Sequence, residues 1–290
     1  MYDKYYQFEI MPFENTADPR LFYASEQHRE ALAAIEFTIR MRKGIVLVTG
    51  PIGSGKTTVG RSMLQRCREH ATIVQLVHGH RSGQELLAHA LRALRVPMQP
   101  HDDHAVMLER LEHFLREQAR AGRPIVLFVD EAQTISDEAL EELRLLSNFD
   151  TETTKLLQLV LVGQPELRDR IASPRFSALR QRIVMAKQLR PMTIHETAGY
   201  IRHRIKQSSR QPDAPRVAFG GDAITVLHSF ARGVPRLINV VCDNCLLLGY
   251  VKQTQRITPS MVQQVVADMV PSFSFEAATD QGPYSLAGSF

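Results

Sequence analysis

The fold of this chain is decided by the stretch Ile45-Val-Leu-Val-Thr-Gly-Pro-Ile-Gly-Ser-Gly-Lys-Thr57. Its first half is a short β-branched run, which is typical of a buried strand. Its second half, Gly50–Thr57, fits the pattern G-x-x-x-x-G-K-[ST], and a helical pattern follows from Lys56 to His70. Because a phosphate-binding loop lies between a strand and a helix, this order predicts a P-loop.

Each residue type in this loop has a chemical reason. Glycines let the backbone turn its N–H groups toward phosphate oxygens, in conformations that a Cβ would hinder. We expect Lys56 to reach the β- and γ-phosphates and the Thr57 hydroxyl to ligate Mg²⁺. The start of the following helix adds to anion binding. The expected nucleotide-binding residues of the loop are Gly50, Pro51, Ile52, Gly53, Ser54, Gly55, Lys56, Thr57 and Thr58.

Outward from the loop, apolar runs alternate with helical patterns. Strands are expected over 45–49, 72–77, 125–129, 157–162 and 183–189, and helices over 25–42, 56–70, 83–94, 102–121 and 136–146. This alternation predicts an α/β fold with a three-layer parallel sheet. From 193 to 269 only helical patterns follow, over 193–208, 221–231, 237–251 and 259–269. We therefore expect an α/β core over residues 1–190, a small helical lid domain over 191–270 and a flexible tail over 271–290.

Composition and charge narrow the class of protein. The 290 residues are 44% hydrophobic and 23% charged, which excludes disordered, collagen-like and disulfide-scaffold proteins. The net charge of +4 permits a polyanionic partner but does not require one. The three cysteines fit reduced thiols, and we see neither a signal peptide nor an apolar run long enough for a membrane span. We therefore expect a cytoplasmic protein without a membrane span of its own.

Two carboxylates, Asp130 and Glu131, come directly after the third expected strand. The first could hold Mg²⁺ together with Thr57, and the second could orient and deprotonate a water molecule. A second carboxylate favours hydrolysis of the γ-phosphate over its transfer to another acceptor. The alternative is a solvated acidic turn. With the phosphate loop, the pair predicts a Mg²⁺-dependent ATPase that binds ATP and ADP.

Three further polar positions could complete such a site. Gln164 follows the fourth strand and could contact the γ-phosphate or the attacking water, or simply form a turn before Pro165. Arg180 and Arg182 precede the last strand, and one of them could reach the nucleotide of a neighbouring subunit. Arg236 opens a helix of the second domain and could contact the γ-phosphate from there. For Arg180, Arg182 and Arg236 the alternative is that they are exposed surface arginines.

Taken together, these motifs resemble those of AAA+ ATPases and, more narrowly, of the ExeA (GspA-type) secretion ATPases. The narrower resemblance rests on Tyr5-Tyr6, Pro12-Phe13, Asp18-Pro19, Asp130-Glu-Ala-Gln133, Leu140-Glu-Glu-Leu-Arg-Leu-Leu-Ser-Asn148, Gly163-Gln-Pro-Glu-Leu167, Leu179-Arg-Gln-Arg-Ile183 and Tyr200-Ile-Arg-His-Arg204. It spans roughly residues 1–270 and implies sensor 1 at Gln164, the arginine finger at Arg182 and sensor 2 at Arg236.

The same resemblance implies a homo-oligomer, as a ring or filament, that drives assembly in a secretion, pilus or exopolysaccharide-export system. Its partner would lie in the inner membrane, and the protein would be peripheral to that membrane. Two features depart from the family. ExeA itself continues into a membrane span and a peptidoglycan-binding domain, and this sequence shows neither. Sensor 1 in AAA+ proteins is more often Asn or Thr than Gln.

A competing hypothesis comes from similarity to the transposition regulators TniB and TnsC, which bind DNA in ATP-dependent filaments. Basic residues that could contact DNA phosphates are Arg40, Arg42, Lys43, Arg61, Arg66 and Arg68. Solvated helix faces are the favoured explanation of these residues because the net charge is low.

Two smaller patterns have structural explanations. Cys242 and Cys245 have the spacing of metal ligands, but they lie in an apolar helical run and the only other cysteine is Cys67. We therefore expect them to pack in a core. The aromatic rings of Tyr5, Tyr6, Phe8 and Phe13 could pack either over an adenine or against a core.

Overall fold

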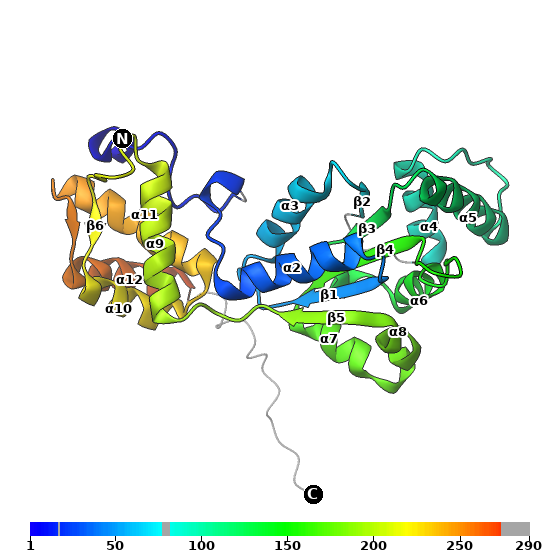
Figure 1. The fold of residues 1–290 in the computed structure, drawn as a ribbon. Helices are drawn as coiled ribbons and strands as arrows, with labels where there is room; N and C mark the ends of the chain where they lie inside the picture. Colours follow the sequence, from blue (N-terminus) through cyan, green and yellow to red (C-terminus); the bar gives the residue numbers. More distant parts are fainter. Residues whose placement is uncertain (17, 77–81, 274–290) are drawn as a thin grey trace, which may run out of the picture. The chain divides into compact units, whose positions relative to one another are not determined.

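A computed structural model of the chain describes residues 1–16, 18–76 and 82–273 (Figure 1). The chain forms two compact units. One, called here the core unit, comprises residues 17–191, and the other, called the helical unit, joins residues 1–16 to the segment from 192 onward. The sequence-based domains differ from these units in the first sixteen residues, which were expected in the α/β core. Of the expected tail, residues 274–290 lie outside the described residues.

The core unit is built on five parallel strands. They are β1 (Ile45–Thr49), β2 (Thr72–Leu76), β3 (Ile125–Val129), β4 (Leu157–Gly163) and β5 (Ile183–Gln188). Their order in the sheet is β2-β3-β4-β1-β5, and every pairing is parallel. The predicted α/β fold with a parallel sheet is confirmed. Because the strands run the same way, β1, β3 and β4 all end at one edge of the sheet, where the phosphate loop begins.

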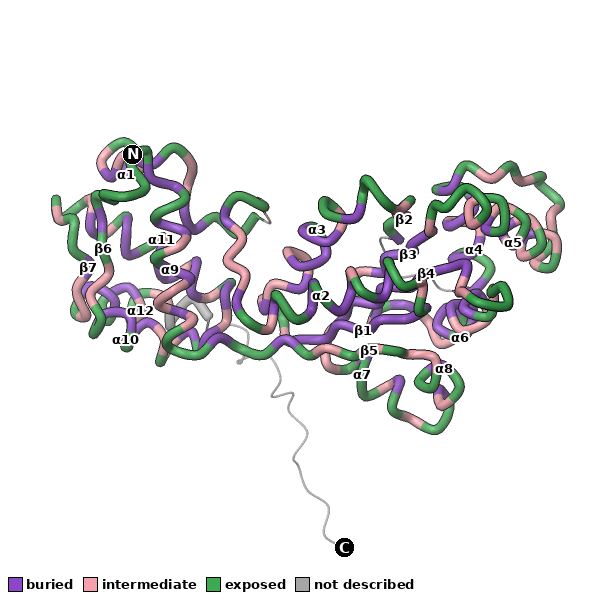
Figure 2. Tube along the Cα trace, viewed as in Figure 1, coloured by how far each residue is buried: buried purple, intermediate pink, exposed green. Residues whose placement is uncertain are grey.

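Alternating side chains of the strands supply two hydrophobic cores, one on each face of the sheet. Along β1, every residue is buried (Figure 2). Ile45 and Leu47 belong to one core, and Val46 and Val48 belong to the other. One face is covered by α2 (Glu26–Arg40) and α3 (Lys56–Cys67). The other is covered by α4 (Gly83–Ala93), α5 (His104–Arg120), α6 (Asp137–Leu146), α7 (Pro165–Ala172) and α8 (Ser177–Arg182). The central strands are therefore buried on both sides.

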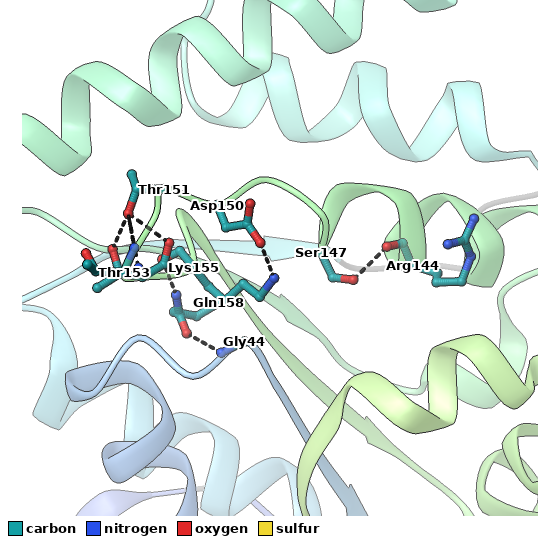
Figure 3. A network of polar contacts seen from close by, with 9 residues as sticks. Gly44, Arg144, Ser147, Asp150, Thr151, Thr153, Lys155 and Gln158 are labelled. Atoms are coloured by element: carbon teal, nitrogen blue, oxygen red, sulfur yellow. Dashed lines mark hydrogen bonds and ion pairs between the residues drawn. The ribbon is translucent and has the colours of Figure 1, made fainter.

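A polar network joins the segments that lead into β1 and β4 (Figure 3). The fully buried side chain of Gln158 accepts a hydrogen bond from the backbone N–H of Gly44 at 2.8 Å and donates one to the Lys155 carbonyl at 3.0 Å. The Lys155 amine forms an ion pair with Asp150 at 2.5 Å. Since a buried amide must be hydrogen-bonded, this network fixes the two strands at their amino ends. Their opposite ends carry the phosphate loop and Gln164.

The described residues of the helical unit form four long helices and one short parallel strand pair. The helices are α9 (Ile194–Ser208), α10 (Gly221–Ala231), α11 (Pro235–Val251) and α12 (Pro259–Phe273), and the strands are β6 (Ala218–Phe219) and β7 (Arg256–Ile257). A capping box between Thr193 and Glu196 begins α9. Cys242 and Cys245 are fully buried in α11, as their apolar spacing predicts. Among the helices that the structure describes, none combines the length and the apolar character needed to cross a bilayer.

The first sixteen residues belong to the helical unit, in which the aromatic side chains of Tyr2, Tyr6, Phe8 and Phe13 are buried. In the short helix α1 (Tyr2–Tyr6), the Tyr6 ring is fully buried, and its hydroxyl hydrogen-bonds to the Leu246 and Thr254 carbonyls at 3.3 and 3.0 Å. Asn15 accepts a hydrogen bond from the Asn239 side chain at 3.0 Å. Of the two environments considered for these aromatic rings, Tyr6 therefore occupies a core, where its hydroxyl has hydrogen-bond acceptors.

Candidate nucleotide site

The phosphate loop between β1 and α3 has the backbone that its glycines predict. Gly53 and Gly55 have φ angles of 76° and 93°, in the left-handed region that side chains disfavour. Gly50 is required for space instead, because a Cβ there would lie 2.9 Å from the Cβ of Leu189. Ile52, in the middle of the loop, is 62% exposed. The loop is thus a turn that only this glycine pattern allows.

The Lys56 side chain lies inside this turn. It is only 6% exposed, and its Nζ donates hydrogen bonds to the carbonyls of Gly50 and Pro51 at 2.9 and 3.0 Å. Burial lowers the pKa of this amine, and the nearby carboxylates of Glu131 and Asp130 act in the opposite direction. A cation held among oxygens at the mouth of a glycine-rich turn is suited to phosphate.

Thr57 and Asp130 are brought together from a helix and from the end of a strand. Thr57 lies in the first turn of α3, Asp130 follows β3, and the Thr57 side chain is close enough to affect the pKa of the Asp130 carboxyl. Burial raises the pKa of the Asp130 carboxyl, and hydrogen bonds from the Glu131 backbone and from Thr57 partly oppose this shift. The expected Mg²⁺ pair therefore sits side by side.

Glu131 follows in an unusual backbone conformation, with a φ of 50°. Its N–H donates to Asp130 Oδ1 at 2.9 Å, and its exposed carboxylate accepts hydrogen bonds from two glutamine amides. Gln133 Nε2 donates to Glu131 Oε2 at 2.6 Å, and Gln164 Nε2 donates to the same oxygen at 3.3 Å. The predicted residue Gln164 is thus in contact with Glu131. The sequence reasoning assigned no role to Gln133.

A second residue that the sequence reasoning missed is His28 in α2. Its ring is 3% exposed, and Nε2 lies 3.0 Å from the Ser54 carbonyl while Nδ1 lies 2.9 Å from Ser25 Oγ. A carbonyl can only accept, so Nε2 carries the proton and donates to the loop. Gly55 leaves room for this ring, because a Cβ there would lie 3.0 Å from Nε2. His28 therefore packs against the phosphate loop and holds it through the Ser54 carbonyl.

The residues at this edge fit a nucleotide with a magnesium ion. The loop offers turned backbone N–H groups, a buried cation and a helix start, which together suit a phosphate chain. Ser54 Oγ is buried and has no hydrogen-bond partner among the described residues, so the loop contains a hydroxyl that is available to hydrogen-bond to a ligand. Thr57 and Asp130 supply the oxygen ligands that Mg²⁺ prefers.

The predicted arginines lie away from this edge. Arg182 ends α8 directly before β5, whose first residue, Ile183, pairs with Ile45 at the amino end of β1. The hydrogen bond from Lys155 lowers the pKa of the Asp150 carboxyl, and the charge of Arg182 adds to this. Arg180, in contrast, donates to the Ala172 carbonyl at 2.6 Å. Both arginines are thus at the opposite edge of the sheet from the phosphate loop.

The remaining predicted residues are exposed or half-buried. Arg236 is an exposed residue at the start of α11 in the helical unit. The basic residues considered for DNA contact lie on α2, on α3 or just after these helices, and Arg66 forms an ion pair with Glu36 at 3.2 Å. These positions match the solvated helix faces that the sequence favours.

Comparisons with known proteins agree with this geometry. The model of the AAA domain family matches residues 39–171, which include the phosphate loop, the carboxylate pair and Gln164. The chain is 33% identical over 257 residues to general secretion pathway protein A of Aeromonas hydrophila. That alignment covers 89% of this chain and 46% of the relative, so the chain spans about half of the relative's length.

Solved structures share the fold. The Aeropyrum pernix ORC2 protein, in ADPNP-ADP complexes, matches 90% of this chain and 72% of its own with a TM-score of 0.62 at 16% identity. Cdc6p from Pyrobaculum aerophilum matches 89% of this chain and 70% of its own with a TM-score of 0.63, also at 16% identity. The RuvB Holliday junction branch migration motor of Thermotoga maritima matches 84% and 69%, with a TM-score of 0.53 at 19% identity. Such low identities show the fold alone.

Proposed function

We propose that the chain is an AAA ATPase of the general secretion pathway protein A type, and that it hydrolyses Mg²⁺–ATP to drive assembly or remodelling in a secretion, pilus or exopolysaccharide-export system. One observation carries the chemical part of the proposal. The phosphate loop, the Thr57–Asp130 pair and Glu131 converge at one edge of the sheet. The biological part rests on the similarity to the Aeromonas hydrophila relative, and we propose an inner-membrane partner and a peripheral cytoplasmic location on the same basis.

Each residue has a separate task in this proposal. The loop N–H groups and Lys56 bind the phosphates, and Thr57 and Asp130 hold the metal. When bound, Mg²⁺ neutralises the charge that develops on the phosphate oxygens. Glu131 accepts the proton of the attacking water, because it is the exposed carboxylate next to the metal pair. Gln164 lies beside Glu131, where its amide can contact the water or the γ-phosphate.

The arginine finger is assigned to Arg182, acting on the nucleotide of a neighbouring subunit. Strand β1 has five residues, so its two ends lie about 16 Å apart at 3.3 Å per residue. Arg182 at one edge is therefore too far to reach the phosphate loop of its own chain at the other. A charge at this position fits a self-assembled ring or filament, in which each subunit completes the site of the next. Arg236 is assigned to nucleotide sensing from the helical unit.

Two substitutions test the assignment of the site. Lys56→Ala removes the cation inside the loop, and we expect it to abolish binding of a fluorescent ATP analogue. Glu131→Gln keeps the size of the side chain, and we expect unchanged nucleotide affinity with turnover reduced by about 100-fold or more, the scale of general-base catalysis. Equal loss of affinity and turnover in Glu131→Gln would place this residue in the metal shell instead. Unchanged ATP affinity in Lys56→Ala would refute the phosphate site.

A further inference from the structure

We propose that Gln133 is a positioning residue that orients the Glu131 carboxylate and links it to Gln164 at the end of β4. This inference rests on the proposed function, since it concerns the orientation of the base assigned there. It concerns a residue that lies in the short helix η2 (Ala132–Thr134), outside the phosphate loop and the carboxylate pair.

The two ends of one side-chain amide make this link. Gln133 Oε1 accepts the backbone N–H of Gln164 at 3.0 Å, and Gln133 Nε2 donates to Glu131 Oε2 at 2.6 Å. A backbone N–H can only donate and an ionised carboxylate can only accept, so chemistry settles which end of the amide faces which partner. No other side-chain type of this length offers a donor and an acceptor in this arrangement. Glutamate would place an oxygen against the carboxylate.

Both amide donors hold the same carboxylate oxygen. Gln164 Nε2 joins Gln133 Nε2 on Glu131 Oε2, at 3.3 Å. Glu131 Oε1 receives no hydrogen bond from any residue that the structure describes. Two donors on one oxygen restrict the rotation of the carboxylate, and the other oxygen is left to accept a proton from water.

Gln133 is itself held in place by its surroundings. Arg170 donates hydrogen bonds to the carbonyls of Gln133 and Ile135 at 2.9 and 3.1 Å, and it forms an ion pair with Asp137 at 2.6 Å. Gly163 leaves the space that the amide occupies, because a Cβ there would lie 3.0 Å from Gln133 Oε1. The amide is therefore pre-organised by residues of β4 and α7 rather than by its own short helix.

The link crosses between adjacent strands. β3 and β4 pair directly, and Glu131 and Gln164 follow their ends. A movement of Gln164 on contact with phosphate or water would therefore also move the Glu131 carboxylate, because the Gln133 amide is hydrogen-bonded to both residues. A purely structural role for Gln133 would affect folding or nucleotide affinity, whereas a positioning role affects turnover alone.

Kinetics separate these two roles. In Gln133→Ala the orienting donor is lost, and we expect kcat to fall about tenfold, the effect of about 1.4 kcal/mol. In Gln133→Glu the acceptor for the Gln164 N–H is kept but an oxygen faces Glu131, and we expect a larger fall than in Gln133→Ala. KM, nucleotide affinity and melting temperature should stay close to those of the unsubstituted protein. Gln65→Ala, at an exposed glutamine of α3, is the matched control and should change nothing.

A double-mutant cycle tests the link to Gln164. Because Gln133 holds the Gln164 backbone, and both amides hold one oxygen, the combined loss in Gln133→Ala/Gln164→Ala should be smaller than the product of the single losses. Independent effects that multiply would overturn the link.

A measurement without ATP turnover tests the contact itself. In ligand-free protein labelled with ¹⁵N-glutamine, Glu131→Ala should shift the side-chain NH₂ signals of Gln133 and Gln164, and Gln133→Ala should shift the Gln164 signals. If Glu131→Gln keeps full turnover while these shifts occur, the proposed base is wrong but the contact stands. If the shifts are absent, or if both Gln133 variants keep or exceed normal kcat, the positioning role is overturned.

Discussion

At the scale of single residues, the conformation of the phosphate loop depends on the buried His28 ring as well as on the glycines of the loop. The His28 ring is buried between Ser25 Oγ and the Ser54 carbonyl, and it contacts the loop where Gly55 has no side chain. A buried carbonyl that loses its hydrogen-bond donor carries a desolvation cost of about 1–3 kcal/mol. His28 therefore limits which conformations the loop adopts before a nucleotide arrives.

We predict that His28→Ala weakens nucleotide binding by about 5- to 30-fold, since part of this cost falls on the ordered loop. Titration of the protein with a fluorescent nucleotide measures the effect. His70→Ala removes an exposed imidazole of the same unit and should leave affinity unchanged. Equal affinities in both variants would show that His28 serves the packing of α2 and not the loop.

Residue types with a local pattern were the ones that the sequence could identify. Lys56, Asp130 and Glu131 follow strands at fixed spacing, so their chemistry is readable from the chain. His28 and Gln133 carry no such signal, because each depends on a contact with a distant residue: His28 with Ser54, 26 residues away, and Gln133 with Gln164, 31 residues away. Only the folded backbone brings such pairs together.

At the scale of elements, α3 approaches the sheet closely enough to require a glycine. Gly60 lies in the middle of α3, and a Cβ there would lie 2.4 Å from Phe128 Cζ in β3. Phe128 is 1% exposed and has little space to move. The approach matters for function because α3 begins at Lys56 and carries Thr57.

We predict that Gly60→Ala lowers the free energy of unfolding of the core unit by about 1–3 kcal/mol, as expected for overpacking. The sign is informative, because alanine in place of glycine inside an unhindered helix stabilises it by about 1 kcal/mol. Urea denaturation followed by circular dichroism measures the change. Gly221→Ala is the control, since a Cβ there meets no atom within 4 Å. A Gly60→Ala protein as stable as the parent would refute the close contact.

Strong periodicity decided which elements the sequence could predict. The expected strands 45–49 and 125–129 coincide with β1 and β3, whose five residues are all buried. The helices α7 and α8, with 8 and 6 residues, and the two-residue strands β6 and β7 were missed. These two helices have only about two turns or fewer, and each of these strands has two residues. Elements this short leave no repeating pattern of apolar residues to detect.

At the scale of the whole molecule, each chain separates its phosphate loop from its candidate arginine finger. The register of β5 against β1 puts Arg182 beside Ile45 and the loop beyond Thr49. Under the proposed function, this separation would make activity a property of an assembly, because no single chain would hold a complete site.

We predict that mixing Arg182→Ala protein with Lys56→Ala protein restores part of the ATPase activity. In mixed assemblies, an intact phosphate loop from one variant meets an intact arginine from the other. Arg182→Ala mixed with the double variant Lys56→Ala/Arg182→Ala should recover nothing, which controls for concentration. If no ratio gives recovery, although mixed oligomers are present by size-exclusion chromatography and light scattering, the finger is not Arg182.

The sequence placed the change from α/β to helical pattern near residue 190, and the compact units also divide between residues 191 and 192. It put the first sixteen residues in the α/β core, whereas they pack in the helical unit, because aromatic rings and prolines fit several environments. Their partners lie at the far end of the chain, beyond the reach of any local pattern.

This connectivity sets an order of events on the ribosome. The core unit is continuous in sequence, so all of its strands have emerged before the helical unit is complete. Tyr6, by contrast, is made 248 residues before the Thr254 carbonyl that it meets. At about 5–20 residues per second, this aromatic segment waits roughly 12 to 50 seconds for its binding place. The core unit can thus fold first, and the aromatic segment that precedes it in the chain is buried only afterwards.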